Sequence, residues 1–261
     1  MSFQPYVPVG GLAGWRFLQS TIETQRAAHG KAPVLERDLA YFREKIGDVK
    51  TAEDLVGDYR LLSVALNAFG LGDEINSKFL IKKVLEEGTF DPKSLANKLS
   101  DKRYRDMSRA FGFGDFPVPN TVLSDFPDKI AARYKVQKFE ADMGQTSETM
   151  RLALNAQREL PALAAGKGSN RTKWFTLMGT PPVRKVMSTA LNLSPAVATL
   201  PIDRQLEIFL ERSQALFGTN DIGELASGKT LDRVLDRYAA LDQSNDAGAV
   251  SSPALVLLRG F

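Results

Sequence analysis

The chain contains no cysteine and a single histidine, His29, among its 261 residues. The absence of cysteine excludes disulfide bonds, thiolate metal sites and a cysteine nucleophile. One histidine cannot build the three-histidine or HExxH zinc sites of catalytic enzymes. We therefore expect no metal and no cofactor, and we assign no catalytic residue. His29 itself is expected on the surface or at the end of a helix.

Long hydrophobic runs are also missing. The apolar stretch at residues 253–261 is far shorter than the roughly 20 residues that a membrane-spanning helix requires. Residues 1–14 lack the basic segment and apolar run of a cleaved secretory signal. We therefore expect no membrane span, and either a cytoplasmic protein or one exported without a cleaved signal.

The excess of positive charge is small. Lys and Arg number 34 and Asp and Glu number 31, which leaves a net charge of +3. The most basic segment, residues 102–109, mixes basic and acidic side chains as a solvated helix face does. Its basic members are Lys102, Arg103, Arg105 and Arg109. We expect no nucleic-acid partner, and a weak nucleic-acid-binding module on this helix stays an alternative.

The apolar residues that are present recur at spacings of three and four, which is the period of an amphipathic helix. Leu35, Leu39, Phe42 and Ile46 follow this spacing. Further stripes of the same kind occur at residues 55–69, 75–84, 206–217 and 231–241. Alternating β-branched runs typical of strands are missing. The sequence therefore predicts an all-α protein of about a dozen short helices with essentially no sheet.

Helix boundaries are marked by proline and glycine. A capping side chain precedes proline at Asp91, Thr180, Ser194 and Ser252, which predicts a helix start at each place. Thr51 and Asp54 form an acidic variant of the capping box. Glycines predicted to end helices are Gly47, Gly70, Gly88, Gly112, Gly179 and Gly218.

These boundaries divide the chain into helical blocks. We predict an N-terminal segment with one amphipathic helix (1–32), a first helical block (33–116), a connecting helical pair (117–170), a second helical block (171–241), and a flexible linker with an apolar tail (242–261). The first block ends in the glycine–aromatic string FGFGDF at residues 111–116.

Residues 223–230 match the phosphate-binding pattern GxxxxGK[ST]. That chemistry requires a buried strand before the loop, so that backbone N–H groups surround the phosphates at the start of a helix. Residues 217–222 read as a turn instead. We therefore interpret the match as a turn between helices and expect no small-molecule ligand there.

Apolar side chains gather near both ends of the chain. An apolar segment behind a flexible linker either docks on its own domain or binds a partner, as an amphipathic helix binds a groove. The residues predicted to bind a protein partner are Trp15, Phe17, Leu18, Leu255, Leu257, Leu258 and Phe261.

Several segments together resemble the alphaproteobacterial family called Domain of Unknown Function 1217. The resemblance is carried by residues 54–71, 82–89, 91–92, 95–104 and 110–115, and continues at 135–140, 151–154, 160–161, 174–175, 178–182 and 202–206. It implies a helical protein of unassigned biochemistry whose genes are often found beside flagellar genes. It implies no catalytic residues.

These observations favour a non-enzymatic helical interaction or structural protein associated with flagellar assembly or motility. The partner would be a flagellar component or a second copy of the chain, and the protein would be cytoplasmic or associated with the flagellum. Two alternatives stay open. One is an enzyme with an unrecognised carboxylate site between the helical blocks, and the other is the nucleic-acid-binding module.

Overall fold

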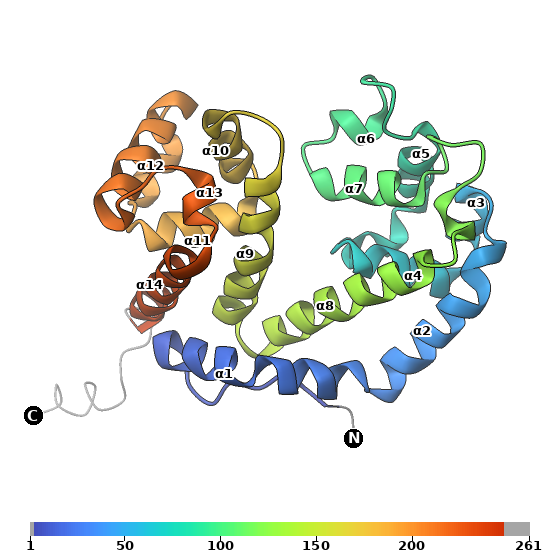
Figure 1. Cartoon of the computed structure of the whole chain (residues 1–261), viewed down its shortest axis with the longest axis horizontal. Helices are drawn as coiled ribbons and strands as arrows, with labels where there is room; N and C mark the ends of the chain where they lie inside the picture. Colours follow the sequence, from blue (N-terminus) through green and yellow to red (C-terminus); the bar gives the residue numbers. More distant parts are fainter. Residues whose placement is uncertain (1–2, 248–261) are drawn as a thin grey trace, which may run out of the picture. The chain divides into compact units, whose positions relative to one another are not determined.

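The computed structural model describes residues 3–247, with side chains up to Asp242. This part of the chain contains 14 α-helices, four 3₁₀-helices and no strand (Figure 1). The predicted all-α class is therefore confirmed. The apolar stripes explain this outcome, since each buries one face of a helix and leaves the other in water.

The chain divides into two compact units. Unit 1 holds Glu23–Asp142 and the residues before Tyr6, and unit 2 holds Tyr6–Ile22 and the residues from Met143 onward. Two helices contribute residues to both units: α1 (Gly11–Gly30) and α8 (Phe126–Thr146).

The predicted helical blocks 33–116 and 171–241 lie within units 1 and 2, respectively. The predicted connecting pair, 117–170, is shared between the units. Its first helix, α8, belongs mostly to unit 1, and its second helix, α9 (Glu148–Ala165), belongs to unit 2.

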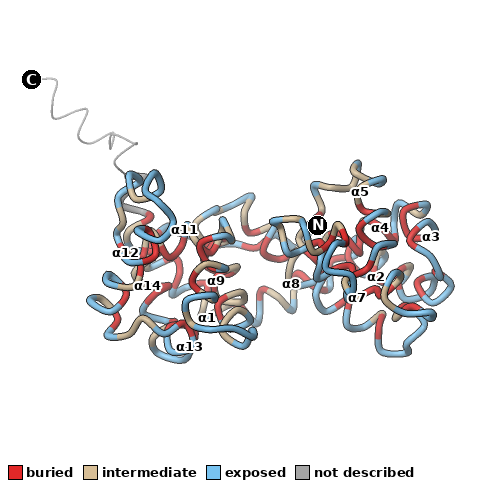
Figure 2. Tube along the Cα trace, turned by 90° about the horizontal axis from the view of Figure 1, so that it is seen from above, coloured by how far each residue is buried: buried red, intermediate tan, exposed pale blue. Residues whose placement is uncertain are grey.

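Unit 1 is built on the stripe predicted at its start, because Leu35, Leu39, Phe42 and Ile46 are all at most 5% exposed. Figure 2 shows buried and exposed positions alternating along its helices. Besides parts of α1 and α8, unit 1 contains α2 (Pro33–Lys45), η1 (Ile46–Asp48), α3 (Ala52–Gly57), α4 (Tyr59–Ala68), η2 (Gly72–Asn76), α5 (Lys78–Glu87), α6 (Leu95–Lys98), α7 (Lys102–Phe111) and η3 (Asn120–Val122).

Unit 2 is centred on large aromatic side chains: Trp174, Phe209 and Tyr238 are each at most 1% exposed. Three of its helices, α9, α11 and α14, contact one another. Besides part of α1, unit 2 contains α9, α10 (Asn170–Met178), α11 (Pro181–Ala190), η4 (Pro195–Thr199), α12 (Ile202–Phe217), α13 (Ile222–Leu225) and α14 (Gly228–Ala247).

Most predicted helix starts are present. The Thr51–Asp54 capping box forms both of its hydrogen bonds at the start of α3. Thr180 precedes α11, and Ser194 precedes η4. The predicted start at Asp91 is wrong, because its carboxylate accepts a hydrogen bond from the Lys93 N–H at 2.8 Å and forms a turn. Ser252 lies outside the described residues.

The predicted helix ends divide into two groups. Gly70, Gly88, Gly112 and Gly218 adopt the left-handed conformation that favours glycine. Gly179 instead ends α10 in a right-handed conformation, and Gly47 lies inside η1. The predicted helix end is therefore confirmed at Gly179, although without a left-handed residue, and it is wrong at Gly47, because the helical path continues through it as η1.

The phosphate-loop match forms a turn between helices, as interpreted from the sequence. Its first residues form α13, and Gly228 begins α14 with a φ of 46°. The segment before it is α12, which ends at Phe217, rather than a strand.

Candidate functional site

The predicted partner-binding residues near the N-terminus have different environments. Trp15 and Leu18 are 2% and 0% exposed, whereas Phe17 is 36% exposed. Burial leaves Trp15 and Leu18 no surface for a partner in this conformation, so this part of the prediction narrows to Phe17. Leu255, Leu257, Leu258 and Phe261 lie outside the described residues, and their role stays a prediction.

Unit 1 carries a pair of exposed aromatic side chains that the sequence did not single out. Phe90 is 67% exposed and Phe116 is 44% exposed. Their ring centroids lie 5.4 Å apart at an interplanar angle of 87°, which is the favoured edge-to-face arrangement. We call these two side chains the aromatic pair.

Two glycines bring the backbone segments of the aromatic pair together. A Cβ atom at Gly114 would lie far inside van der Waals contact with the Glu86 carbonyl oxygen and the Gly88 nitrogen. Gly88 has a φ of 66°, and a Cβ there would meet the Gly114 backbone. The end of α5 and the loop after α7 therefore pack backbone against backbone, which only glycine permits.

The carboxylate of Asp115 connects the same two segments. It accepts hydrogen bonds from the Thr89 N–H at 2.5 Å, the Thr89 hydroxyl at 2.8 Å and the Phe90 N–H at 3.0 Å. Charge-assisted hydrogen bonds of this kind are stronger than neutral ones. Asp115 therefore fixes the backbone at Phe90, whose ring is exposed.

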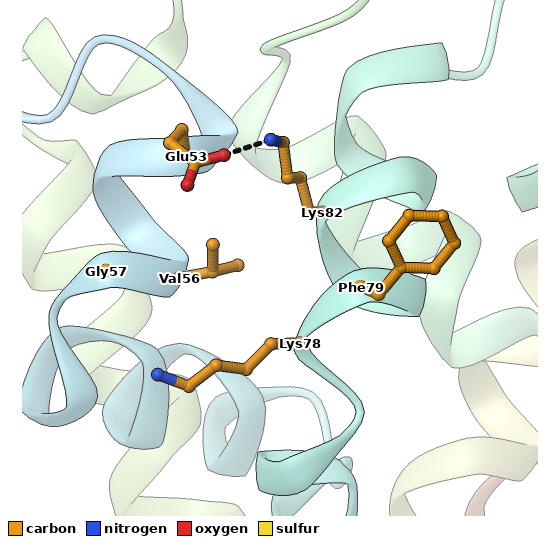
Figure 3. A pocket seen from close by; sticks show the side chains of 6 residues that line it. All are labelled: Glu53, Val56, Gly57, Lys78, Phe79 and Lys82. Atoms are coloured by element: carbon orange, nitrogen blue, oxygen red, sulfur yellow. Dashed lines mark ion pairs between the residues drawn. The ribbon is translucent and has the colours of Figure 1, made fainter.

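A shallow hollow of about 310 Å³ lies between α3 and α5 (Figure 3). Val56 and Gly57 line its α3 side, and Phe79, which is 80% exposed, lines its α5 side. Lys82 forms an ion pair with Glu53 at the rim. Hydrogen bonding to Glu53 raises the pKa of Lys82, which favours the ammonium form of this side chain.

The resolved pKa shifts of the described groups all favour the ordinary charge state at neutral pH. Hydrogen bonding from Thr51 lowers the pKa of Asp54. Burial raises the pKa of Tyr134 to about 12 and also raises the pKa of Tyr238. A general acid or base working near pH 7 needs shifts in the opposite direction. The resolved shifts of these described groups therefore move their pKa values away from neutral pH.

His29 lies at the end of α1, as predicted, but it is only 2% exposed, so the surface position is wrong. Its Nε2 lies 2.9 Å from Asp142 Oδ2, and Lys138 Nζ donates to Asp142 Oδ1 at 2.6 Å. The edge of the imidazole meets the ring of Phe139 at 5.5 Å. Burial would raise the pKa of Asp142, but hydrogen bonds from His29 and Lys138 outweigh it and lower the pKa.

Replacing Asp142 by asparagine is expected to lower the free energy of unfolding by about 1–2 kcal/mol at pH 7, because the two hydrogen bonds lose the carboxylate charge. A lowered folded-state pKa stabilises the fold above the unfolded pKa of about 3.9, and this stabilisation is lost as the pH falls through the folded value. The difference from wild type should therefore narrow as the pH falls below the unfolded pKa of about 3.9, and it should close below the lowered folded-state pKa. Urea unfolding followed by circular dichroism measures it.

Asp128 gives the matched control, since it lies on the same helix but is exposed and pairs with Arg43 at the surface. Asp128→Asn should change the free energy of unfolding by less than about 0.5 kcal/mol at every pH. An Asp142→Asn difference that stays constant down to pH 3 would contradict the assignment.

The basic helix of the nucleic-acid alternative is α7. Arg103 donates to both carboxylate oxygens of Asp101 at 3.0 Å and to the Gly70 carbonyl. Lys102 Nζ donates to the Leu99 carbonyl at 2.8 Å. Two of the four basic side chains are therefore held by neighbouring groups. All four are exposed, as expected for a solvated helix face.

Among residues 3–247, no group of three His, Asp or Glu side chains is placed to hold a metal ion. In the same range, none of the helices combines the length and hydropathy needed to cross a bilayer.

The fold and the surface features together define an all-α protein whose unit 1 exposes an aromatic pair on a backbone held by Asp115 and two glycines. The sequence profile of the family described as a protein of unknown function, DUF1217, matches residues 68–231. The match spans more than half of the sequence, and the chain therefore belongs to the DUF1217 family.

A solved structure supports the same fold. The chain is similar to the crystal structure of protein AGR_C_984 from Agrobacterium tumefaciens, with a TM-score of 0.74 and 26% sequence identity. The likeness covers 93% of this chain and 99% of that one. No curated protein matches the chain.

Proposed function

We propose that this chain is a non-enzymatic protein-binding protein and that the aromatic pair of Phe90 and Phe116 is a contact for its partner. One observation carries the proposal: two exposed phenylalanine rings are held by a backbone that Asp115 and two glycines fix in place. Aromatic side chains are enriched in protein interfaces relative to other surfaces.

A rigid presentation favours binding for an energetic reason. Ordering a mobile side chain at an interface costs about 0.5–1.5 kcal/mol, and a group that is already ordered avoids part of this cost. Two rings that are mutually packed before the partner arrives bury their remaining area at little entropic expense. The hydrogen bonds of Asp115 thus have a role beyond local stability.

We further propose that the partner is a flagellar component, so that the protein acts in flagellar assembly or motility. The support for this part is the resemblance to a family whose genes are often found beside flagellar genes. Phe17 and the apolar tail, with Leu255, Leu257, Leu258 and Phe261, would provide additional contacts by helix-in-groove docking.

The double variant Phe90→Ser, Phe116→Ser is expected to weaken partner binding at least tenfold, because the loss of two aromatic contacts exceeds about 1.4 kcal/mol. A photo-crosslinking residue at position 90 in the full chain identifies the partner in cells. Titration of that partner with the variant then gives the change in dissociation constant, and swimming motility of a complemented deletion strain gives the cellular effect.

Tyr59→Ser is the matched control, since Tyr59 is an aromatic residue of unit 1 that is 62% exposed. It should leave both binding and motility at the wild-type level. Wild-type behaviour of the double variant in both measurements would refute the role of the aromatic pair. Loss of binding with normal motility would refute the flagellar part alone.

A further inference from the structure

The exposed side of α5 presents an ordered row of side chains. Phe79, Lys82, Lys83, Glu86 and Glu87 line one shallow hollow of about 330 Å³. We call this row the α5 face. From the start of the helix to its end, it runs from an aromatic ring through two ammonium groups to two carboxylates.

This charge order opposes the local preferences of a helix. The helix macrodipole favours acidic side chains at the start of a helix and basic ones at its end, and α5 has the reverse order. Within a helix, Glu four residues before Lys is also better than Lys before Glu. The pairs Lys82–Glu86 and Lys83–Glu87 have the weaker orientation and N–O distances of 3.8 Å. Lys82 also pairs with Glu53 of α3, and Glu87 accepts a hydrogen bond from the Leu95 N–H at 2.5 Å. Lys83 and Glu86 are therefore the charged groups of the face on which the argument from charge order rests.

The same order is self-complementary when two helices run antiparallel. We propose that the α5 face binds the α5 face of a second copy of this chain about a two-fold axis. An axis at the level of Val84 and Leu85 would place Lys82 beside Glu87 of the second copy and Lys83 beside Glu86 of the second copy. The two antiparallel helix dipoles would then also attract each other.

Phe79 provides the apolar part of this interface. Phe79 precedes the level of the proposed axis by five to six residues, which corresponds to about 8 Å along the helix at a rise of 1.5 Å per residue. Each ring would therefore cover the end of α5 in the second copy, where the turn after Glu87 begins. A ring that is 80% exposed in the single chain would in this way become buried.

The interface is small, so the dimer is weak. Two phenylalanine side chains bury about 150–250 Å² each, which is well below the roughly 1,200 Å² of a stable complex. The expected dissociation constant lies in the micromolar to millimolar range, and the two symmetric Lys83–Glu86 pairs between the copies fix the register. The inference goes beyond the proposed function, because it rests on the charge order of α5 and not on the aromatic pair.

Charge reversal of the full chain tests the proposal by sedimentation equilibrium. Lys82→Glu with Lys83→Glu turns the face wholly acidic, and Glu86→Lys with Glu87→Lys turns it wholly basic. Each variant alone should dimerise at least tenfold more weakly than wild type. An equimolar mixture of the two should dimerise again, because opposite charges then face each other.

Lys167→Glu with Lys185→Glu is the control, since both lysines are exposed on unit 2 and their reversal changes the net charge equally. This variant should dimerise as wild type does. Phe79→Ser, which keeps every charge, should also weaken the dimer if circular dichroism shows an intact fold.

A wild-type chain that remains monomeric at 1 mM, on the order of the weakest affinity expected here, would overturn the proposal. A dimer that both charge-reversed variants retain would also overturn it. Lys82→Glu with Lys83→Glu leaves both rings of the aromatic pair in place, so it should keep the partner binding of the proposed function while it weakens this dimer. The two proposals therefore fail separately.

Discussion

Truncating Trp174 to alanine is expected to lower the free energy of unfolding of unit 2 by about 3–5 kcal/mol. The indole is fully buried and packs edge-to-face on Phe209, with ring centroids 5.9 Å apart. Its Nε1 donates to the Asn220 carbonyl at 2.8 Å. The variant loses both the packing and this hydrogen bond. Urea unfolding followed by the fluorescence of Trp15, which also belongs to unit 2, measures the effect.

Trp174→Phe separates the two contributions. Phenylalanine keeps most of the apolar contact, and the Asn220 carbonyl keeps its hydrogen bond from the Asn170 side chain at 2.9 Å. The cost should therefore fall to about 1–2 kcal/mol. A phenylalanine variant as unstable as the alanine variant would mean that the hydrogen bond, rather than the packing, dominates at this site.

Replacing Gly114 by alanine is expected to destabilise unit 1 by about 3 kcal/mol, at the upper end of overpacking costs. The new methyl group would clash with backbone atoms of Glu86 and Gly88. Backbone atoms cannot move aside as the end of a flexible side chain can. The variant should also weaken partner binding, because the aromatic pair depends on this contact. Thermal unfolding followed by circular dichroism measures the stability.

Gly57→Ala is the matched control in the same unit. A Cβ atom there meets open space, and Gly57 ends α3 without a positive φ. We expect a change between zero and about 1 kcal/mol of stabilisation, from the reduced freedom of the unfolded chain. Similar losses at positions 57 and 114 would show that the close approach at Gly114 has no special cost.

The sequence predicted the helices well because their signals are local. The stripe from Leu35 to Ile46 and the Thr51–Asp54 box depend on residues a turn apart, and both are confirmed. The Asp91 signal is equally local, but the same side chain can cap a helix or a turn. Here the turn is favoured by Asn97, which is more distant in the sequence. Its side-chain amide donates to the Thr89 and Asp91 carbonyls and closes the loop.

The candidate site could not be predicted in the same way. The FGFGDF string was recognised only as the end of a block, whereas its glycine and aspartate act on residues 86–90. Such a contact joins positions distant in sequence and leaves no periodic signal. The burial of Trp15 and Leu18 within the chain could not be predicted either. An apolar helix near a terminus has the same sequence pattern whether it packs on its own chain or binds a partner.

The division of α1 and α8 between the units has a practical consequence for dissecting this protein. Because unit 2 takes Tyr6–Ile22 from the start of the chain and the rest from Met143 onward, no single cleavage releases either unit whole. A fragment that begins at residue 23 would start in the middle of a helix and would deprive unit 2 of Trp15 and Leu18. Point substitutions in the intact chain are therefore the sound way to assign activities to one half or the other.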